Sequence, residues 1–119
     1  MYSSILNITF DCSDPRALAR FWGGVTGWDA HEQDATPGHL EFAVGPQTAG
    51  GPRLYFVQVP EPKVIKNRIH LDLIPPEDDQ EAELARLVGL GASVVGDQPT
   101  GVAWVILADP EGNEFCLEG

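Results

Sequence analysis

Apolar and polar side chains alternate in two stretches of the chain, ILNITFDC (residues 5–12) and NRIHLDL (residues 67–73). Alternation with a period of two is typical of a strand that buries one face, so each stretch is predicted to be an amphipathic strand. The predicted buried sides carry Leu6, Ile8, Phe10 and Cys12 in the first stretch and Ile69, Leu71 and Leu73 in the second. The polar sides carry Asn7, Thr9 and Asp11, and Arg68, His70 and Asp72.

A helix is predicted after each of these strands. In SDPRALARFWGGVTGW (residues 13–28), Asp14 can cap the helix, Pro15 suits its first position, and apolar side chains such as Trp22 recur at helical spacing. Glycines up to Gly27 favour the helix end. The second helix is predicted from about residue 77 to residue 89, because several carboxylates lie where they favour the helix dipole.

Further strands are predicted after each helix, near residues 28–32, 39–44 and 53–59 and near residues 92–96, 102–108 and 113–118. DPEG, from Asp109, fits a type I turn between the last two. Sliding the chain by 63 residues lays Asn7 on His70 and Thr9 on Asp72. We therefore predict an α+β fold in which one βαβββ module occurs twice, at about residues 3–59 and 67–119, joined by a linker at residues 60–66.

The two modules are predicted to form a single domain over residues 1–119. Helices must cover the apolar faces of the sheets, so they lie on the outside, and the curved mixed sheets enclose a half-open barrel or cleft lined by the polar faces. In RLYFVQV (residues 53–59), Phe56 and Gln58 share one side and are predicted to form an apolar cleft wall with a polar tip. Trp104 is interpreted as a core residue or as a flat wall that stacks a planar ligand, with the core favoured.

The net charge of the chain limits the classes of partner that it is expected to bind. The chain has 18 acidic and 7 basic residues and a net charge of -11. We expect no nucleic-acid partner, because such binding needs clustered Lys and Arg, whereas the negative field would favour a cationic ligand. No apolar run is long enough for a membrane span and the N-terminus does not resemble a signal peptide, so we expect a cytoplasmic protein with no membrane partner.

Four segments carry a resemblance to a known family: DPRALARFW after the first strand, RIHLDL at the start of the second module, LGA after the second helix, and DPEGNEFCLE near the C-terminus. With the doubled module, they resemble the vicinal oxygen chelate superfamily, which includes glyoxalases, extradiol dioxygenases and bleomycin resistance proteins. The narrower likeness is to small bacterial glyoxalase-like domain proteins. Many proteins of this fold form homodimers, so the resemblance implies a homodimer here.

The resemblance also implies where a metal ion would be held. Metal-dependent members use four side chains, typically His, Glu or Gln, from the first and last strands of each module. In this sequence those positions are Asn7, Gln58, His70 and Cys116. One imidazole, two amides and one thiol do not neutralise a hard divalent ion, and catalytic zinc needs three protein ligands. We therefore expect no bound metal and no cofactor.

Cys116 has no CxxC partner, so neither a disulfide framework nor a zinc knuckle is indicated. We do not expect it to be a nucleophile, because Glu114 and Glu118 would raise the pKa of its thiol if they share its face.

Three functions remain open. The first is a glyoxalase-like protein that binds a small organic molecule in the cleft without a metal, sequestering a cationic compound as bleomycin resistance proteins sequester a drug. The second is a lyase or isomerase with His70 as acid–base residue; the simpler role for His70 is a cavity-lining polar group. The third is a non-catalytic regulatory dimerisation module. The residues predicted to contact the ligand are Asn7, Thr9, Phe56, Gln58, His70, Asp72, Trp104 and Cys116.

Overall fold

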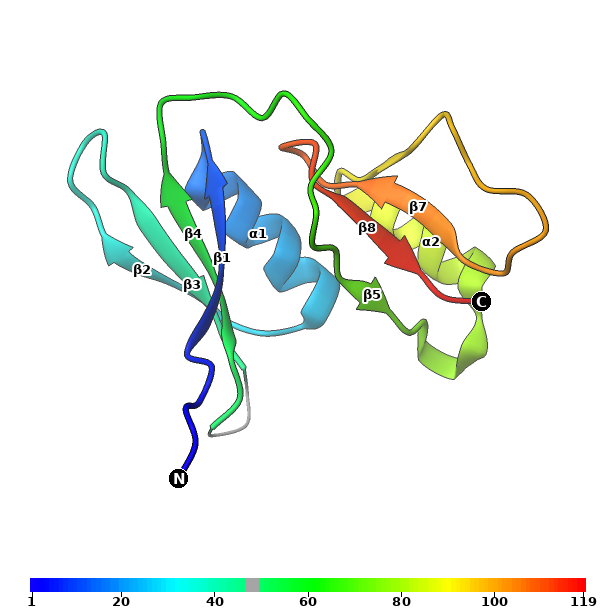
Figure 1. Cartoon of the computed structure of the whole chain (residues 1–119), viewed down its shortest axis with the longest axis horizontal. Helices are drawn as coiled ribbons and strands as arrows, with labels where there is room; N and C mark the ends of the chain where they lie inside the picture. The colour runs from blue at the N-terminus through cyan, green and yellow to red at the C-terminus, as the bar shows by residue number, and fades with distance from the viewer. Residues whose placement is uncertain (47–49) are drawn as a thin grey trace. The chain divides into compact units, whose positions relative to one another are not determined.

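The computed structural model describes residues 1–46 and 50–119, which form two compact units, unit 1 (Met1–Lys63) and unit 2 (Val64–Gly119) (Figure 1). Unit 1 contains β1 (Asn7–Cys12), α1 (Pro15–Thr26), β2 (Ala30–Asp34), β3 (Glu41–Val44) and β4 (Arg53–Gln58). Unit 2 contains β5 (Asp72–Leu73), the 3-10 turn η1 (Pro76–Asp78), α2 (Gln80–Leu90), β6 (Ser93–Val94), β7 (Val105–Ala108) and β8 (Glu114–Leu117). The predicted α+β fold, with a βαβββ plan in each unit, is confirmed.

Both units build a four-stranded mixed sheet with the same topology. The strand orders are β1-β4-β3-β2 and β5-β8-β7-β6. In each sheet the first strand of the unit runs parallel to its last strand, and the other neighbours are antiparallel. The first and last strands of each unit therefore lie side by side, which sets Asn7 opposite Arg53 and Asp72 opposite Cys116.

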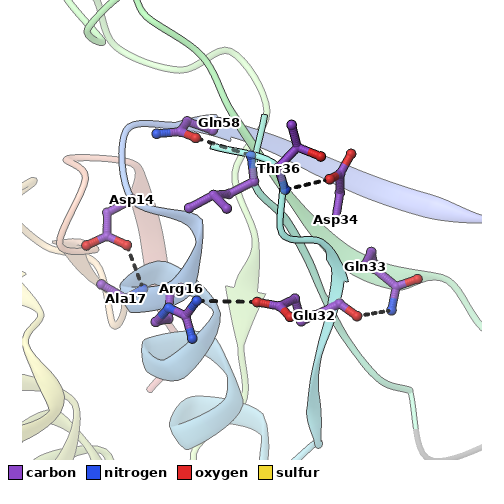
Figure 2. A network of polar contacts seen from close by, with 9 residues as sticks. Asp14, Arg16, Ala17, Glu32, Gln33, Asp34, Thr36 and Gln58 are labelled. Carbon is purple, nitrogen blue, oxygen red and sulfur yellow. Dashed lines mark hydrogen bonds and ion pairs between the residues drawn. The ribbon is translucent and has the colours of Figure 1, made fainter. Parts of the chain in front are cut away.

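Helix α1 forms as its sequence predicts. The side chain of Asp14 accepts a hydrogen bond from the backbone N–H of Ala17 at 3.1 Å (Figure 2), and Pro15 occupies the first helical position. The helix ends at Gly27, whose φ of 73° is left-handed and suits glycine. Among the described residues, no helix is both long and apolar enough to cross a membrane.

The core of unit 1 lies between α1 and one face of its sheet. The Phe10 ring lies 5.7 Å from the Trp22 ring of α1 and 5.1 Å from the Phe56 ring of β4. Arg16 of α1 contacts the same face, since its guanidinium lies over the ring of Phe42. Side chains alternate along a strand, so the residues between these, such as Asn7, Thr9 and Tyr55, project from the opposite face, which we call the polar face of unit 1.

The second helix begins later than predicted, at Gln80 rather than near Glu77. Glu77 and Asp78 have φ values of 57° and 55°, which break the helical path. Asp79 then caps the helix by accepting a hydrogen bond from the backbone N–H of Ala82 at 3.0 Å. Glu77 and Asp78 therefore lie in the turn before the helix, whereas Glu81 lies in its first turn.

The strand predicted over residues 67–73 forms only at Asp72–Leu73, and the expectation that Ile69 is buried is wrong, because its side chain is 81% exposed. The side chain of Asn67 donates to the carbonyl of Ile69 at 2.6 Å and accepts from the backbone N–H of Glu114 at 2.7 Å. These side-chain bonds, one local and one to a residue distant in sequence, replace the regular ladder at the start of the segment. Only the end of the segment pairs as a strand.

Candidate functional site

The residues predicted to bind a ligand fall into separate groups in the two units. Asn7 and Thr9 lie on the polar face of unit 1, whereas His70, Asp72 and Cys116 lie together in unit 2. A cleft shared by the two polar faces stays a prediction from the sequence.

A chain of polar contacts crosses the polar face of unit 1. Arg53 Nε donates a hydrogen bond to Asn7 Oδ1 at 3.0 Å, and the Arg53 guanidinium lies over the Tyr55 ring, 5.4 Å from its centroid. The Tyr55 hydroxyl donates to a carboxylate oxygen of Glu41 on β3. We call these four residues the Arg53 network. It joins β1, β4 and β3, three neighbouring strands of the sheet.

Arg53 and Glu41, the two charged residues of this network, are not paired with each other. Its hydrogen bond to Glu41, together with burial, raises the pKa of Tyr55, so the hydroxyl remains a donor that occupies the Glu41 carboxylate. Within the part of the chain that the structure describes, no carboxylate lies within ion-pairing distance of Arg53. The terminal N–H groups of the Arg53 guanidinium are therefore available to a ligand.

Arg53 is not among the residues that the sequence predicts to contact a ligand. Its signal was its place in RLYFVQV, out of phase with the apolar Leu54 and Phe56. Recognising its contact with Asn7 also requires knowing that β1 and β4 are parallel neighbours in this register.

The predicted cleft wall at Phe56 and Gln58 is wrong. Phe56 is 0% exposed and packs on Phe10 beneath α1, on the face opposite to Asn7 and Thr9. The Gln58 side chain accepts from the backbone N–H of Leu40 at 3.1 Å (Figure 2) and donates to the carbonyl of Ser13. Both side chains therefore hold unit 1 together rather than line its polar face.

Trp104 lies just before β7, and its side chain is 42% exposed. The favoured interpretation as a core residue is therefore wrong. The alternative, a flat surface on which a planar ligand could stack, stays a prediction.

Three side chains of unit 2 bring together a nitrogen, an oxygen and a sulfur ligand atom, all within 4.8 Å of one another, and we call them the unit 2 trio: His70, Asp72 and Cys116. His70 Nε2 lies 3.3 Å from Asp72 Oδ1. The two side chains are therefore in contact, which their spacing in the sequence alone did not establish. Asp72 lies opposite Cys116 in the parallel pair of β5 and β8. His70 and Asp72 are exposed, whereas Cys116 is buried.

Burial is the main cause that raises the pKa of the Cys116 thiol, and the negative charges of Asp72 and Glu118 add to it. The sequence analysis anticipated a contribution from Glu118 but not the one from Asp72. Glu114, also named there, accepts a hydrogen bond from the backbone N–H of Asn67. Cys116 is therefore a protonated thiol at neutral pH, which is unfavourable for nucleophilic attack.

Alkylation of Cys116 by iodoacetamide is expected to be slower at pH 7.5 than that of N-acetylcysteine, because a raised pKa lowers the thiolate fraction. Asp72→Asn should speed the reaction severalfold by removing a negative neighbour. The rate is followed by mass spectrometry of the peptide that contains residue 116. The exposed Asp97→Asn is the matched control and should leave the rate unchanged. Equal rates in wild type and Asp72→Asn would contradict the contribution assigned to Asp72.

The four positions that the family resemblance implies for a metal do not supply a donor set for a hard ion such as Mn(II). Asn7 Oδ1 is hydrogen-bonded to Arg53, and Gln58 is bonded to the backbone. The unit 2 trio adds Asp72 but offers only one carboxylate, beside an imidazole and a thiol, whereas Mn(II) prefers carboxylate, carbonyl and water oxygens. The residues present do not fit manganese; zinc is the ion that accepts N, O and S donors.

Comparison with known proteins finds one matching family model and several solved structures of similar fold. The family model described as Glyoxalase-like domain matches residues 7–118. No curated protein matches the chain.

Solved structures share the fold at low sequence identity. A variant of the fosfomycin resistance protein FosX from Listeria monocytogenes, complexed with Mn(II) and a dihydroxypropylphosphonic acid, has a TM-score of 0.74 and 16% identity, over 99% of this chain and 93% of that one. A glyoxalase/bleomycin resistance protein/dioxygenase family enzyme from Burkholderia phytofirmans gives 0.67 and 18%, over 97% of each chain. The antibiotic-binding protein TnmS3 from a Streptomyces species gives 0.62 and 24%, over 98% of this chain and 95% of that one.

Proposed function

We propose that this chain, which belongs to the glyoxalase-like domain family, binds a small organic molecule without a bound metal ion. Neighbours of the same fold include a fosfomycin resistance protein and an antibiotic-binding protein, which supports a small-molecule ligand as the class. In this proposal the protein sequesters its ligand in the manner of bleomycin resistance proteins. It acts in the cytoplasm as a homodimer.

The contact between Asn7 and Arg53 is the observation that carries the metal-free part of the proposal. Asn7 stands at the first position from which relatives bind a metal, and its oxygen accepts a hydrogen bond from the Arg53 guanidinium at 3.0 Å. A fixed positive charge this close repels a divalent cation. The amide oxygen is also occupied by the hydrogen bond. The Arg53 network thus supplies a protein cation at this position.

The acidity of the chain supports a positive group on the ligand. The net charge of -11 produces a negative field around the protein, and fields of this kind raise the local concentration of cations. Asp72 is an exposed carboxylate of the unit 2 trio and a direct partner for such a group. Binding that depends on this field should weaken when salt is added.

Acid–base catalysis is a second candidate function, favoured by the contact between His70 and Asp72. A carboxylate oxygen 3.3 Å from Nε2 can orient an imidazole for proton transfer. In this alternative the protein is a lyase or isomerase in which His70 moves a proton of the ligand. The non-catalytic regulatory module has no such observation in its favour.

A thermal-shift screen of small organic cations, zwitterions and neutral compounds, run with and without EDTA, tests the proposal. We expect at least one compound to raise the melting temperature equally in both conditions. A shift that disappears in EDTA and returns with Mn(II) or Zn(II) would overturn the metal-free assignment.

Mass spectrometry of each bound compound separates binding from catalysis. Recovery of the compound unchanged supports sequestration. A product formed by wild-type protein and lost in His70→Ala supports the lyase or isomerase instead, whereas a product formed equally by both proteins removes His70 from the reaction.

A further inference from the structure

We propose that the Arg53 network binds the anionic group of a small organic acid, with the Arg53 guanidinium contacting a carboxylate or another anion that presents two oxygens. This inference rests on the proposed function and deepens it, because it adds a negatively charged group to the chemistry of the ligand. A zwitterionic ligand would meet both this requirement and the preference for a positive group.

The Arg53 guanidinium is held in a defined orientation. Its Nε–H is bonded to Asn7 Oδ1 at 3.0 Å, and its Cζ lies over the Tyr55 ring, 5.4 Å from the ring centroid. All three residues are half-buried. A guanidinium fixed at one nitrogen and one face presents its remaining N–H groups as a planar fork, and this fork matches the two oxygens of a carboxylate.

The chain's own carboxylates near this face are committed or distant. Glu41 accepts the hydrogen bond from the Tyr55 hydroxyl. Asp11 lies opposite Val57, four residues along β1 from Asn7, which at the usual strand rise is about 13 Å away. Within the described residues, Arg53 therefore has no carboxylate at ion-pairing distance, although the chain has 18 acidic residues against 7 basic ones.

Neighbouring groups complete a site for an acid with an organic body. Thr9 is exposed and lies opposite Tyr55 in the pairing of β1 with β4, so its hydroxyl is next to the network and can donate a hydrogen bond. A partly buried cation without a counter-ion is unfavourable, and a bound anion would relieve that cost. Because only a charged ligand relieves this cost, the site prefers acids over their neutral analogues.

Nuclear magnetic resonance titration of the full ¹⁵N-labelled chain with benzoate tests the inference, and benzamide serves as the uncharged analogue. We expect benzoate to shift the Arg53 Nε–Hε signal saturably and benzamide to leave it unchanged. Arg53→Gln should lower the benzoate affinity about 10-fold or more, the range expected for a charge-assisted hydrogen-bonded pair. Arg53→Lys retains the charge without the fork and should give an intermediate loss.

Arg20→Gln is the matched control, because Arg20 is an exposed arginine of α1 in the same unit, and it should bind benzoate as wild type does. Equal affinity for benzoate and benzamide, or unchanged affinity in a folded Arg53→Gln, would overturn the anion site. If compounds from the thermal-shift screen still bound without metal, the proposed function would stand. A benzoate shift that required Mn(II) or Zn(II) and was abolished by EDTA would overturn both.

Discussion

Replacing Phe56 with alanine is expected to lower the free energy of unfolding of unit 1 by about 3–5 kcal/mol, the usual cost of truncating a buried aromatic side chain. The ring is fully buried and contacts Phe10, which in turn contacts Trp22 of α1, so its removal leaves a cavity at the junction of helix and sheet. Chemical denaturation followed by tryptophan fluorescence measures the change, because Trp22 reports on this core.

Val57→Ala is the matched control, since Val57 is the next residue of β4 and projects from the opposite face. It removes less side chain from a half-buried position and should cost about 1 kcal/mol or less. If Phe56→Ala unfolded like Val57→Ala but weakened ligand binding, Phe56 would be a cleft wall after all.

Replacing Asp109 with alanine is expected to cost about 2–4 kcal/mol, because buried donors would lose a charged acceptor. Asp109 is 3% exposed, and its carboxylate accepts hydrogen bonds from the backbone N–H groups of Glu111 and Asn113, each at 2.9 Å, and from the Asn113 side chain. These bonds close the turn between β7 and β8, in which Gly112 has a φ of 88°. Thermal or chemical unfolding of the full chain gives the loss.

Asp109→Asn keeps one side-chain oxygen and should lose less stability than Asp109→Ala. Asp97→Ala, at an exposed position in the same unit, should change stability by no more than about 0.5 kcal/mol. A loss for Asp109→Ala no larger than that for Asp97→Ala would show that the carboxylate does not organise the turn.

Features determined by neighbours along the chain could be predicted from the sequence. The cap at Asp14, the end of α1 at Gly27 and the turn at Asp109 each depend on residues within a few positions, and all three form. The repeated βαβββ plan was also visible, because alternation and helical spacing recur in the same order. These signals were sufficient for the fold class and the family.

Features determined by distant partners could not be predicted. Alternation shows that Phe56 and Gln58 share a side, but it does not say which side the helix covers. The prediction placed both residues in the cleft, whereas Phe56 lies on the side that the helix covers. The segment from residue 67 to residue 71 alternates like a strand, yet the bonds of Asn67 to the segment around Glu114, which is distant in sequence, direct it elsewhere. The alternating sequence pattern alone does not show that side-chain hydrogen bonds compete with strand pairing.

In the candidate site too, residues close in sequence could be predicted, whereas contacts across strands could not. His70 and Asp72 were identified because they are close in sequence and share a face, whereas their contact depends on side-chain conformation. Arg53 was missed because its role arises only when β4 lies beside β1 and brings it to Asn7. Proximity across strands, rather than motif, thus determines the polar chemistry of unit 1.

In the proposed function, the Arg53 guanidinium beside Asn7 supplies the positive charge at a position where the family resemblance implies a metal ion. Elemental analysis of the purified full chain, produced in medium supplemented with manganese, zinc, nickel and iron, tests this proposal. We expect far less than one equivalent of any of these metals per chain. About one equivalent, retained through dialysis and removed only by a chelator, would contradict it.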